Sequence, residues 1–92
     1  FTGDIGAAVF DETNETVFVE DFDAHVPLIK DFHVRYMAAN KIVRRWTDYV
    51  RALSPRMLAP QHGAIYKDEN VDKFLNWLGG LECGIDFIDT LF

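Results

Sequence analysis

The stretch Met57-Leu58-Ala59-Pro60-Gln61-His62-Gly63 carries the strongest local signal in this sequence. Three apolar residues lead to a proline, and His62 follows on a predicted loop beside a glycine. This order predicts a short strand over 57–59 that presents an imidazole at the edge of a sheet. A neutral imidazole is a common ligand for iron and zinc. A loop histidine bonded to the backbone is the alternative, and this stretch alone does not decide between the two.

The first residues of the chain repeat the arrangement with a carboxylate. Asp4 lies in the segment Phe1-Thr2-Gly3-Asp4-Ile5-Gly6, between glycines that allow the backbone to bend sharply. A carboxylate can bridge two metal ions about 3.5–4 Å apart. Asp4 and His62 are therefore the candidate metal ligands, although an aspartate that stabilises a turn is the simpler explanation of Asp4 taken alone. The sequence indicates no catalytic residue.

Composition limits the classes of protein to which the chain can belong. With 92 residues of which 49% are hydrophobic, it is expected to form one globular domain, with apolar surface left over for another chain or segment. The net charge is −6, yet residues 35–56 hold six basic side chains and one acidic one. We interpret this basic block as a solvated helix face, because an acidic protein is not expected to bind nucleic acid.

The sequence also bears on location. It contains one cysteine, which excludes a disulfide within the chain and is typical of a reducing cytoplasm. No apolar run approaches the roughly 18 residues needed to cross a membrane, so no membrane partner is expected. The chain opens on Phe1 without an initiator methionine, which we interpret as a sign of a fragment or a processed piece.

Hydrophobic periodicity and turn residues predict alternating strands and helices, which indicates an α/β arrangement. In the first quarter of the chain we expect a strand within 1–10, a turn at 11–15, a strand over 16–19 that forms a hairpin with 7–10, and an acidic loop over 20–25.

Three helices and a tail are expected to follow. The first helix starts near Pro27, has Ile29, Phe32, Tyr36 and Met37 at helical spacing, and is followed by a break at 38–40. The second runs through 42–53, ends at Ser54-Pro55, and has on its apolar face Ile42, Val43, Trp46, Tyr49, Val50 and Leu53. The third is capped by Asp68 or Asn70, ends at Gly79-Gly80, and is buried through Val71, Phe74, Leu75 and Leu78. An apolar tail over 81–92 completes the chain.

Five other side chains are of a type that can carry chemistry, and we expect each to have an ordinary structural role. His25 and His33 are expected to be exposed or hydrogen-bonded histidines rather than ligands. Asp21 and Asp23 are expected in a solvated loop. Cys83 has no Cys or His at ligand spacing, so it is expected to be a partly buried, inert thiol.

Three segments together resemble a known family. Phe1-Thr2-Gly3-Asp4 is similar to the strand-end Gly-Asp motif of the metallo-β-lactamase fold, and Ala59-Pro60-Gln61-His62-Gly63 resembles its last histidine motif. Between them, Tyr36-Met37-Ala38-Ala39-Asn40-Lys41-Ile42 resembles the Tyr-x-x-Ala-Asn helix of flavodiiron proteins and of their relatives, the oxygen-binding di-iron proteins. The order and spacing of these segments over residues 1–80 carry the resemblance.

The resemblance implies that residues 1–92 are a single partial domain, the C-terminal half of a metallo-β-lactamase-like αββα sandwich with a mixed sheet and flanking helices. It implies that Asp4 bridges two iron ions and that His62 is a terminal ligand of one of them. The family's His-x-Glu-x-Asp segment and a further histidine are not in this sequence. The rest of the domain, or a second copy in a homodimer, would have to complete the di-iron centre.

The function that follows from the resemblance is that of part of a non-haem di-iron protein that binds or reduces dioxygen or nitric oxide. Whether it is an enzyme stays open, and FMN is expected only if a separate flavin domain exists. One alternative is a zinc-dependent hydrolase of the same superfamily. Another is a metal-free interaction domain, whose basic helix and apolar tail bind a partner protein.

Overall fold

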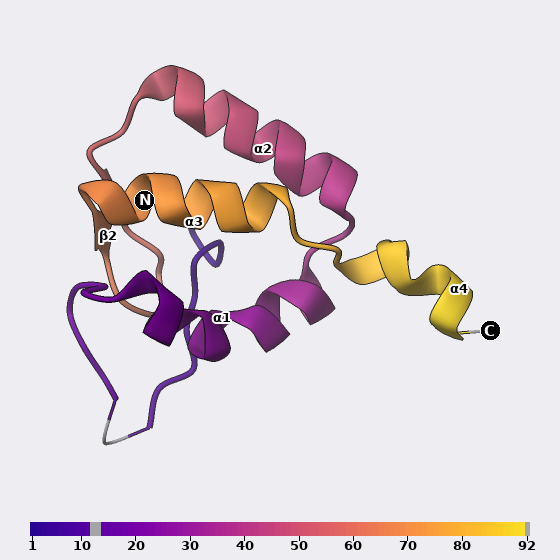
Figure 1. Cartoon of the computed structure of the whole chain (residues 1–92), viewed down its shortest axis with the longest axis horizontal. Helices are drawn as coiled ribbons and strands as arrows, with labels where there is room; N and C mark the ends of the chain where they lie inside the picture. Colours follow the sequence, from indigo (N-terminus) through magenta and orange to yellow (C-terminus); the bar gives the residue numbers. More distant parts are fainter. Residues whose placement is uncertain (12–13, 92) are drawn as a thin grey trace.

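The structure is a computed structural model that describes residues 1–11 and 14–91. Figure 1 shows α3 lying between α2 and α1, while the C-terminal helices extend away from this body. No helix in the described ranges is both long and apolar enough to span a membrane. The elements in chain order are α1 (Phe22–Tyr36), α2 (Asn40–Leu53), β1 (Met57–Leu58), β2 (Tyr66–Lys67), α3 (Glu69–Gly79), the 3-10 helix η1 (Gly84–Phe87) and α4 (Ile88–Leu91).

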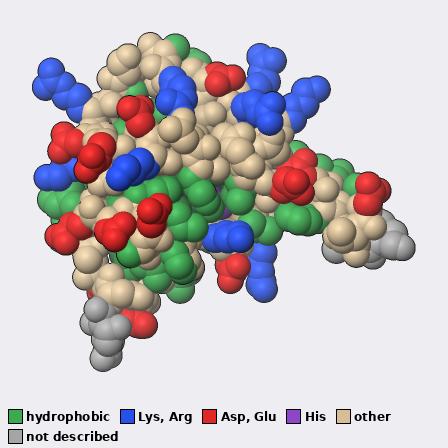
Figure 2. Space-filling model, viewed as in Figure 1, with side chains coloured by type: hydrophobic (Ala, Val, Ile, Leu, Met, Phe, Trp, Pro, Cys, Tyr) green, Lys and Arg blue, Asp and Glu red, His purple; other side chains and the backbone are tan. Residues whose placement is uncertain are grey.

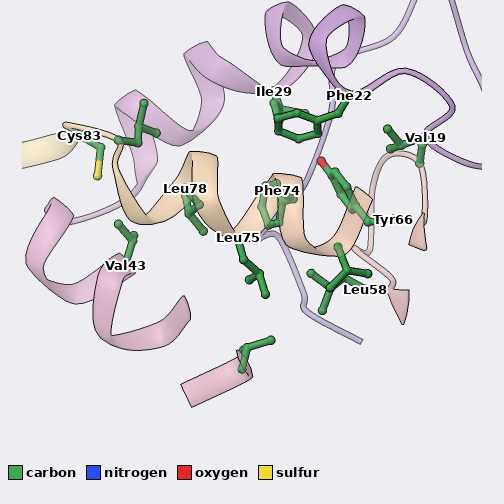
Figure 3. Close-up of a cluster of buried hydrophobic side chains, with 14 residues drawn as sticks. Val19, Phe22, Ile29, Val43, Leu58, Tyr66, Phe74, Leu75, Leu78 and Cys83 are labelled. Atoms are coloured by element: carbon green, nitrogen blue, oxygen red, sulfur yellow. The ribbon is translucent and has the colours of Figure 1, made fainter. Parts of the chain in front are cut away.

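The hydrophobic core is built around α3. The apolar stripe predicted for this helix is confirmed: Val71, Phe74, Leu75 and Leu78 are all buried. Figure 3 shows these side chains meeting residues from α1 and from both strands, with the ring of Tyr66 against Phe74. The predicted stop is also confirmed, because the helix ends within the glycine pair. The periodicity of α3 therefore specified both its position and its buried face.

Helix α1 starts earlier than the sequence predicted. The expected acidic loop over 20–25 and the expected start near Pro27 are wrong, because α1 begins at Phe22. Asp21 caps the helix by accepting a hydrogen bond from the N–H of Ala24 at 3.4 Å. Phe22, the first residue of the helix, is buried. Pro27 lies inside the helix on its exposed side. The cap and the buried first turn outweighed the proline as a start signal.

Helix α2 follows the predicted break, and its first residue is hydrogen-bonded to the end of α3. The side-chain amide of Asn40 donates to the carbonyl oxygens of Gly79 and Leu81, at 2.9 and 2.8 Å, which satisfies acceptors at the C-terminal end of α3. Asn40, the first residue of α2, therefore joins this helix to the end of the core helix. The predicted apolar face of α2 is confirmed in part: Val43 and Val50 are buried, and the half-buried Trp46 packs against the core. Ile42, Tyr49 and Leu53 are exposed, and Thr47 is buried in addition.

The sheet is smaller than predicted. β1 confirms the first two residues of the expected strand over 57–59, and it pairs antiparallel with β2, which the sequence did not predict. The expected hairpin between 7–10 and 16–19 is wrong, since the N–H of Val9 donates to the carbonyl of Leu28 in α1 at 2.9 Å. Phe18 instead forms an isolated parallel bridge with Ile65. The predicted turn at 11–15 includes residues 12 and 13, which lie outside the described residues.

The tail after α3 is only partly covered. Leu81 and Cys83 are buried, whereas Ile85 and Ile88 are exposed on the arm that Figure 1 shows at the right. In Figure 2, lysine and arginine side chains stand out along the upper edge of the molecule, where Figure 1 places α2. The basic block of the sequence therefore lies on a solvated helix face, as predicted.

Candidate metal site

Two backbone segments bring Asp4 and His62 to one edge of the molecule. Gly3 forms a parallel bridge with Pro60. The N–H of Gln61 donates to the carbonyl of Gly3 at 2.6 Å, and the N–H of Thr2 donates to the carbonyl of Ala59 at 3.0 Å. Because the two segments run in the same direction, the residues that follow them emerge at the same edge. The two glycine-flanked loops are therefore neighbours in the structure.

Both candidate side chains are exposed, and both loops are held by their own backbone. The carbonyl of Asp4 accepts a hydrogen bond from the N–H of Ala7 at 3.0 Å, which closes a backbone turn over residues 4–7. The carbonyl of His62 accepts one from the N–H of Ala8 at 3.2 Å. A carboxylate oxygen and an imidazole nitrogen on rigid, open loops suit iron or zinc as donors. Chemically, the two residues fit a metal site.

The number of donors is too small for a complete centre. Within residues 1–11 and 14–91, no group of three or more His, Cys, Asp or Glu side chains is placed to hold a metal ion. Catalytic zinc sites use three protein ligands, and di-metal sites use more. Two donors are too few for either kind of site, so Asp4 and His62 stay candidate ligands of an incomplete site within the described part of the chain.

The other two histidines are both buried, and only His33 meets the expectation of a hydrogen-bonded side chain, because Nε2 of His25 has no hydrogen-bond partner within the described residues. His33 lies with Nδ1 2.7 Å from the carbonyl oxygen of Ile29, and its Nε2 accepts the N–H of Gly6 at 2.8 Å. His25 packs edge-on against the ring of Tyr66. Burial lowers the pKa of both histidines from the usual value of 6.5. Sequence reasoning could not find the bond between His33 and the loop of Asp4, since the two are far apart along the chain.

The remaining candidates are accounted for by structure. Asp21 is the N-cap of α1, and Asp23 is an exposed residue of its first turn, so both belong to a helix start rather than a loop. Cys83 is fully buried, and burial, followed by the nearby carboxylate of Asp86, raises the pKa of its thiol. A protonated, buried thiol is a poor nucleophile. Cys83 is therefore more deeply buried than predicted, and its inertness stays a prediction that this burial supports.

A family model described as "ODP family beta lactamase" matches residues 1–63. The chain belongs to the ODP family. The matched region contains both motifs around Asp4 and His62, as well as the Tyr-x-x-Ala-Asn segment between them. Membership of the ODP family confirms the resemblance drawn from these three segments, together with a β-lactamase-like α/β fold. No protein among those with curated descriptions matches the chain.

Two solved structures of the chemotaxis sensor ODP are similar to this chain along its whole length. One, described as a peroxy diiron species, is 68% identical with a TM-score of 0.93. The other, the apo state from T. denticola, is 70% identical with a TM-score of 0.91. This chain spans only 39% and 38% of those ODP chains. The edge that carries Asp4 and His62 is thus part of an ODP-like fold whose solved examples are much longer.

Proposed function

We propose that this chain is part of an oxygen-binding di-iron protein that acts as a sensor, and that Asp4 and His62 are two of its iron ligands. In this proposal Asp4 would hold iron through a carboxylate oxygen, and His62 would hold it through an imidazole nitrogen. When bound, the pair of irons supplies the redox chemistry that holds dioxygen. The chain's own part is to present a carboxylate and an imidazole at a fixed separation.

One observation carries the proposal. The parallel pairing of Gly3 with Pro60 brings the two glycine-flanked loops to one edge. Among the described residues, Asp4 and His62 are the one pair of exposed side chains of metal-ligand type that lie in two such neighbouring loops. The 68–70% identity to a di-iron chemotaxis sensor over the entire chain supports iron over zinc. Nothing in the fold favours a hydrolase or a metal-free domain.

We further propose that residues 1–92 form the C-terminal part of a larger β-lactamase-like domain. This chain covers about two fifths of the length of the solved ODP chains, so the further ligands would lie in the part that it does not cover. Apolar side chains are exposed beside the candidate site: Phe1 is fully exposed, and Met57 is 52% exposed. Such surface needs a cover. The remaining part of the domain is the preferred cover, and a homodimer is the second arrangement.

Metal analysis of the full-length gene product tests the proposal. The protein, purified without added metal and then loaded anaerobically with Fe(II), is expected to hold two irons and to develop a charge-transfer band in air. Asp4→Ala and His62→Ala are each expected to lower the iron content. Asp48→Ala, which removes an exposed carboxylate from α2, is the matched control and is expected to keep it.

Two results would contradict the proposal. A colourless protein that retains zinc after the same treatment would support the alternative hypothesis of a zinc-dependent hydrolase. Unchanged metal content in both ligand variants would remove Asp4 and His62 from the site altogether. A cytoplasmic location is part of the proposal as well, supported by the single free cysteine.

A further inference from the structure

Gly6, two residues after Asp4, is held by buried side chains on both sides of its backbone. Its N–H donates to Nε2 of His33 at 2.8 Å, and its carbonyl oxygen accepts from the hydroxyl of Tyr66 at 2.9 Å. Both side chains are completely buried, one on α1 and the other on β2. A buried hydrogen bond is costly to lose, because the abandoned partner stays desolvated. The polar groups of Gly6 are thus fixed by two separate elements.

The protonation of the two side chains is determined by their partners. Nδ1 of His33 faces the carbonyl oxygen of Ile29 at 2.7 Å, and a carbonyl can only accept. The proton therefore sits on Nδ1, and Nε2 is left as the acceptor that the N–H of Gly6 requires. Burial lowers the pKa of His33 and raises that of Tyr66, so both keep these roles at neutral pH.

A side chain at position 6 would be strained. The φ of Gly6 is +96°, a conformation that side chains rarely adopt, and an added Cβ would lie 3.0 Å from a ring carbon of Tyr66. The turn that holds Asp4 is therefore attached at both ends. Gly3 is tied to the His62 segment by the N–H of Gln61, and Gly6 is tied to the core by His33 and Tyr66.

We propose that His33 and Tyr66 are positioning residues for the iron ligand Asp4, which hold its turn in the geometry that binds metal. This inference rests on the proposed function. Neither residue touches the metal in it; each acts through the backbone of Gly6. Groups behind the direct ligands orient them, and losing one typically lowers metal affinity about 10- to 100-fold.

Fe(II) affinity, the absorption spectrum of the oxidised protein and the free energy of unfolding are measured together in the full-length gene product. His33→Phe keeps a ring of similar size but removes the acceptor, and Tyr66→Phe removes only the hydroxyl. Each is expected to weaken Fe(II) binding about 10- to 100-fold and to shift the charge-transfer band. His33→Gln is expected to restore part of the affinity, because its amide oxygen can accept from Gly6.

A control variant separates positioning from general loss of stability. Leu78→Ala destabilises the core from the far part of α3, where the side chain makes no bond to the Asp4 turn. It is expected to lower the free energy of unfolding without changing Fe(II) affinity. Tyr66→Phe, which changes volume least, remains informative if His33→Phe does not fold.

The outcomes distinguish the two proposals. If the wild-type protein binds iron and both ring variants bind it as tightly as Leu78→Ala does, the positioning role is overturned and the proposed function stands. If the wild-type protein binds no iron, the proposed function is overturned and the positioning role with it. Nitrogen chemical shifts of His33 that show a proton on Nε2 would also overturn the positioning role, whatever the metal content.

Discussion

The N–H of Gln61 donates to the carbonyl oxygen of Gly3 at 2.6 Å, and each of these residues directly precedes a candidate metal ligand. The separation of Asp4 and His62 is therefore set by the backbone and not by their side chains. Replacing either side chain leaves this bond in place. Loss of iron in such a variant would report the loss of a donor atom, with little contribution from a displaced loop.

Iron binding is expected to stabilise the full-length protein. A ligand that binds only the folded state adds about 2.7 kcal/mol to the free energy of unfolding when its free concentration is 100 times its dissociation constant. Anaerobic thermal or urea unfolding with and without Fe(II) measures this gain. The gain should persist in Asp48→Ala and be smaller in Asp4→Ala. An equal gain in Asp4→Ala would show that iron binds elsewhere.

Gly63, next to His62, should not tolerate a side chain. Its φ is +123°, and a Cβ would lie 2.7 Å from the backbone nitrogen of Ala8. Gly63→Ala is expected to lower the free energy of unfolding by about 1–3 kcal/mol, because it forces a strained conformation and moves the His62 loop. Gly80→Ala is the matched control, since the nearest atom there is 3.7 Å from the added Cβ. Similar losses in both variants, measured by urea unfolding, would contradict the proposed close packing at Gly63.

Asn40 should contribute more to stability than an exposed asparagine does. Its amide donates to the carbonyls of Gly79 and Leu81, so Asn40→Ala leaves both acceptors without this partner. We expect a loss of about 1–3 kcal/mol in the free energy of unfolding. Asn76→Ala removes only an exposed bond to Arg51 and should cost less than about 0.5 kcal/mol. Equal costs for the two variants would show that the Asn40 bonds do not stabilise the end of α3.

Two buried histidines make the stability depend on pH. His25 and His33 have folded-state pKa values below 6.5, so the unfolded chain binds more protons than the folded one once the pH drops below that value. Stability is therefore full above pH 6.5 and decreases as the pH falls. The slope reaches at most about 1.4 kcal/mol per pH unit for each histidine.

Urea unfolding of wild type and His33→Gln at pH 7.5 and 5.5 tests this dependence. Glutamine does not titrate, so the variant should lose less stability than the wild type between the two pH values. Parallel losses in the two proteins would show that the pKa of His33 is the same in the folded and unfolded states.

Sequence reasoning reached the features that depend on neighbours within a few residues. The stripe over Val71, Phe74, Leu75 and Leu78 specified α3, because helical periodicity places these positions on one face. The break over 38–40 and the stop at Ser54 follow from turn chemistry in the same way. The glycine-flanked motifs around Asp4 and His62 likewise indicated two exposed loops with donor atoms.

The features that sequence reasoning missed depend on contacts between distant segments. β2 and the early start of α1 were not predicted, because burial against α3 selects these residues and local propensity does not. The hairpin failed for the same reason: Val9 bonds to α1 and Phe18 to the segment before β2.

By itself, the sequence determined the two candidate ligands, the core helix and the family to which the chain belongs. Only the tertiary structure decided that the ligand loops share an edge and that His33 and Tyr66 hold the turn of Asp4. The physical reason is the distance along the chain over which each interaction acts. Periodicity and turn preferences act along the chain, whereas a buried imidazole and a buried hydroxyl find their partner at Gly6 only after three separate segments have packed together.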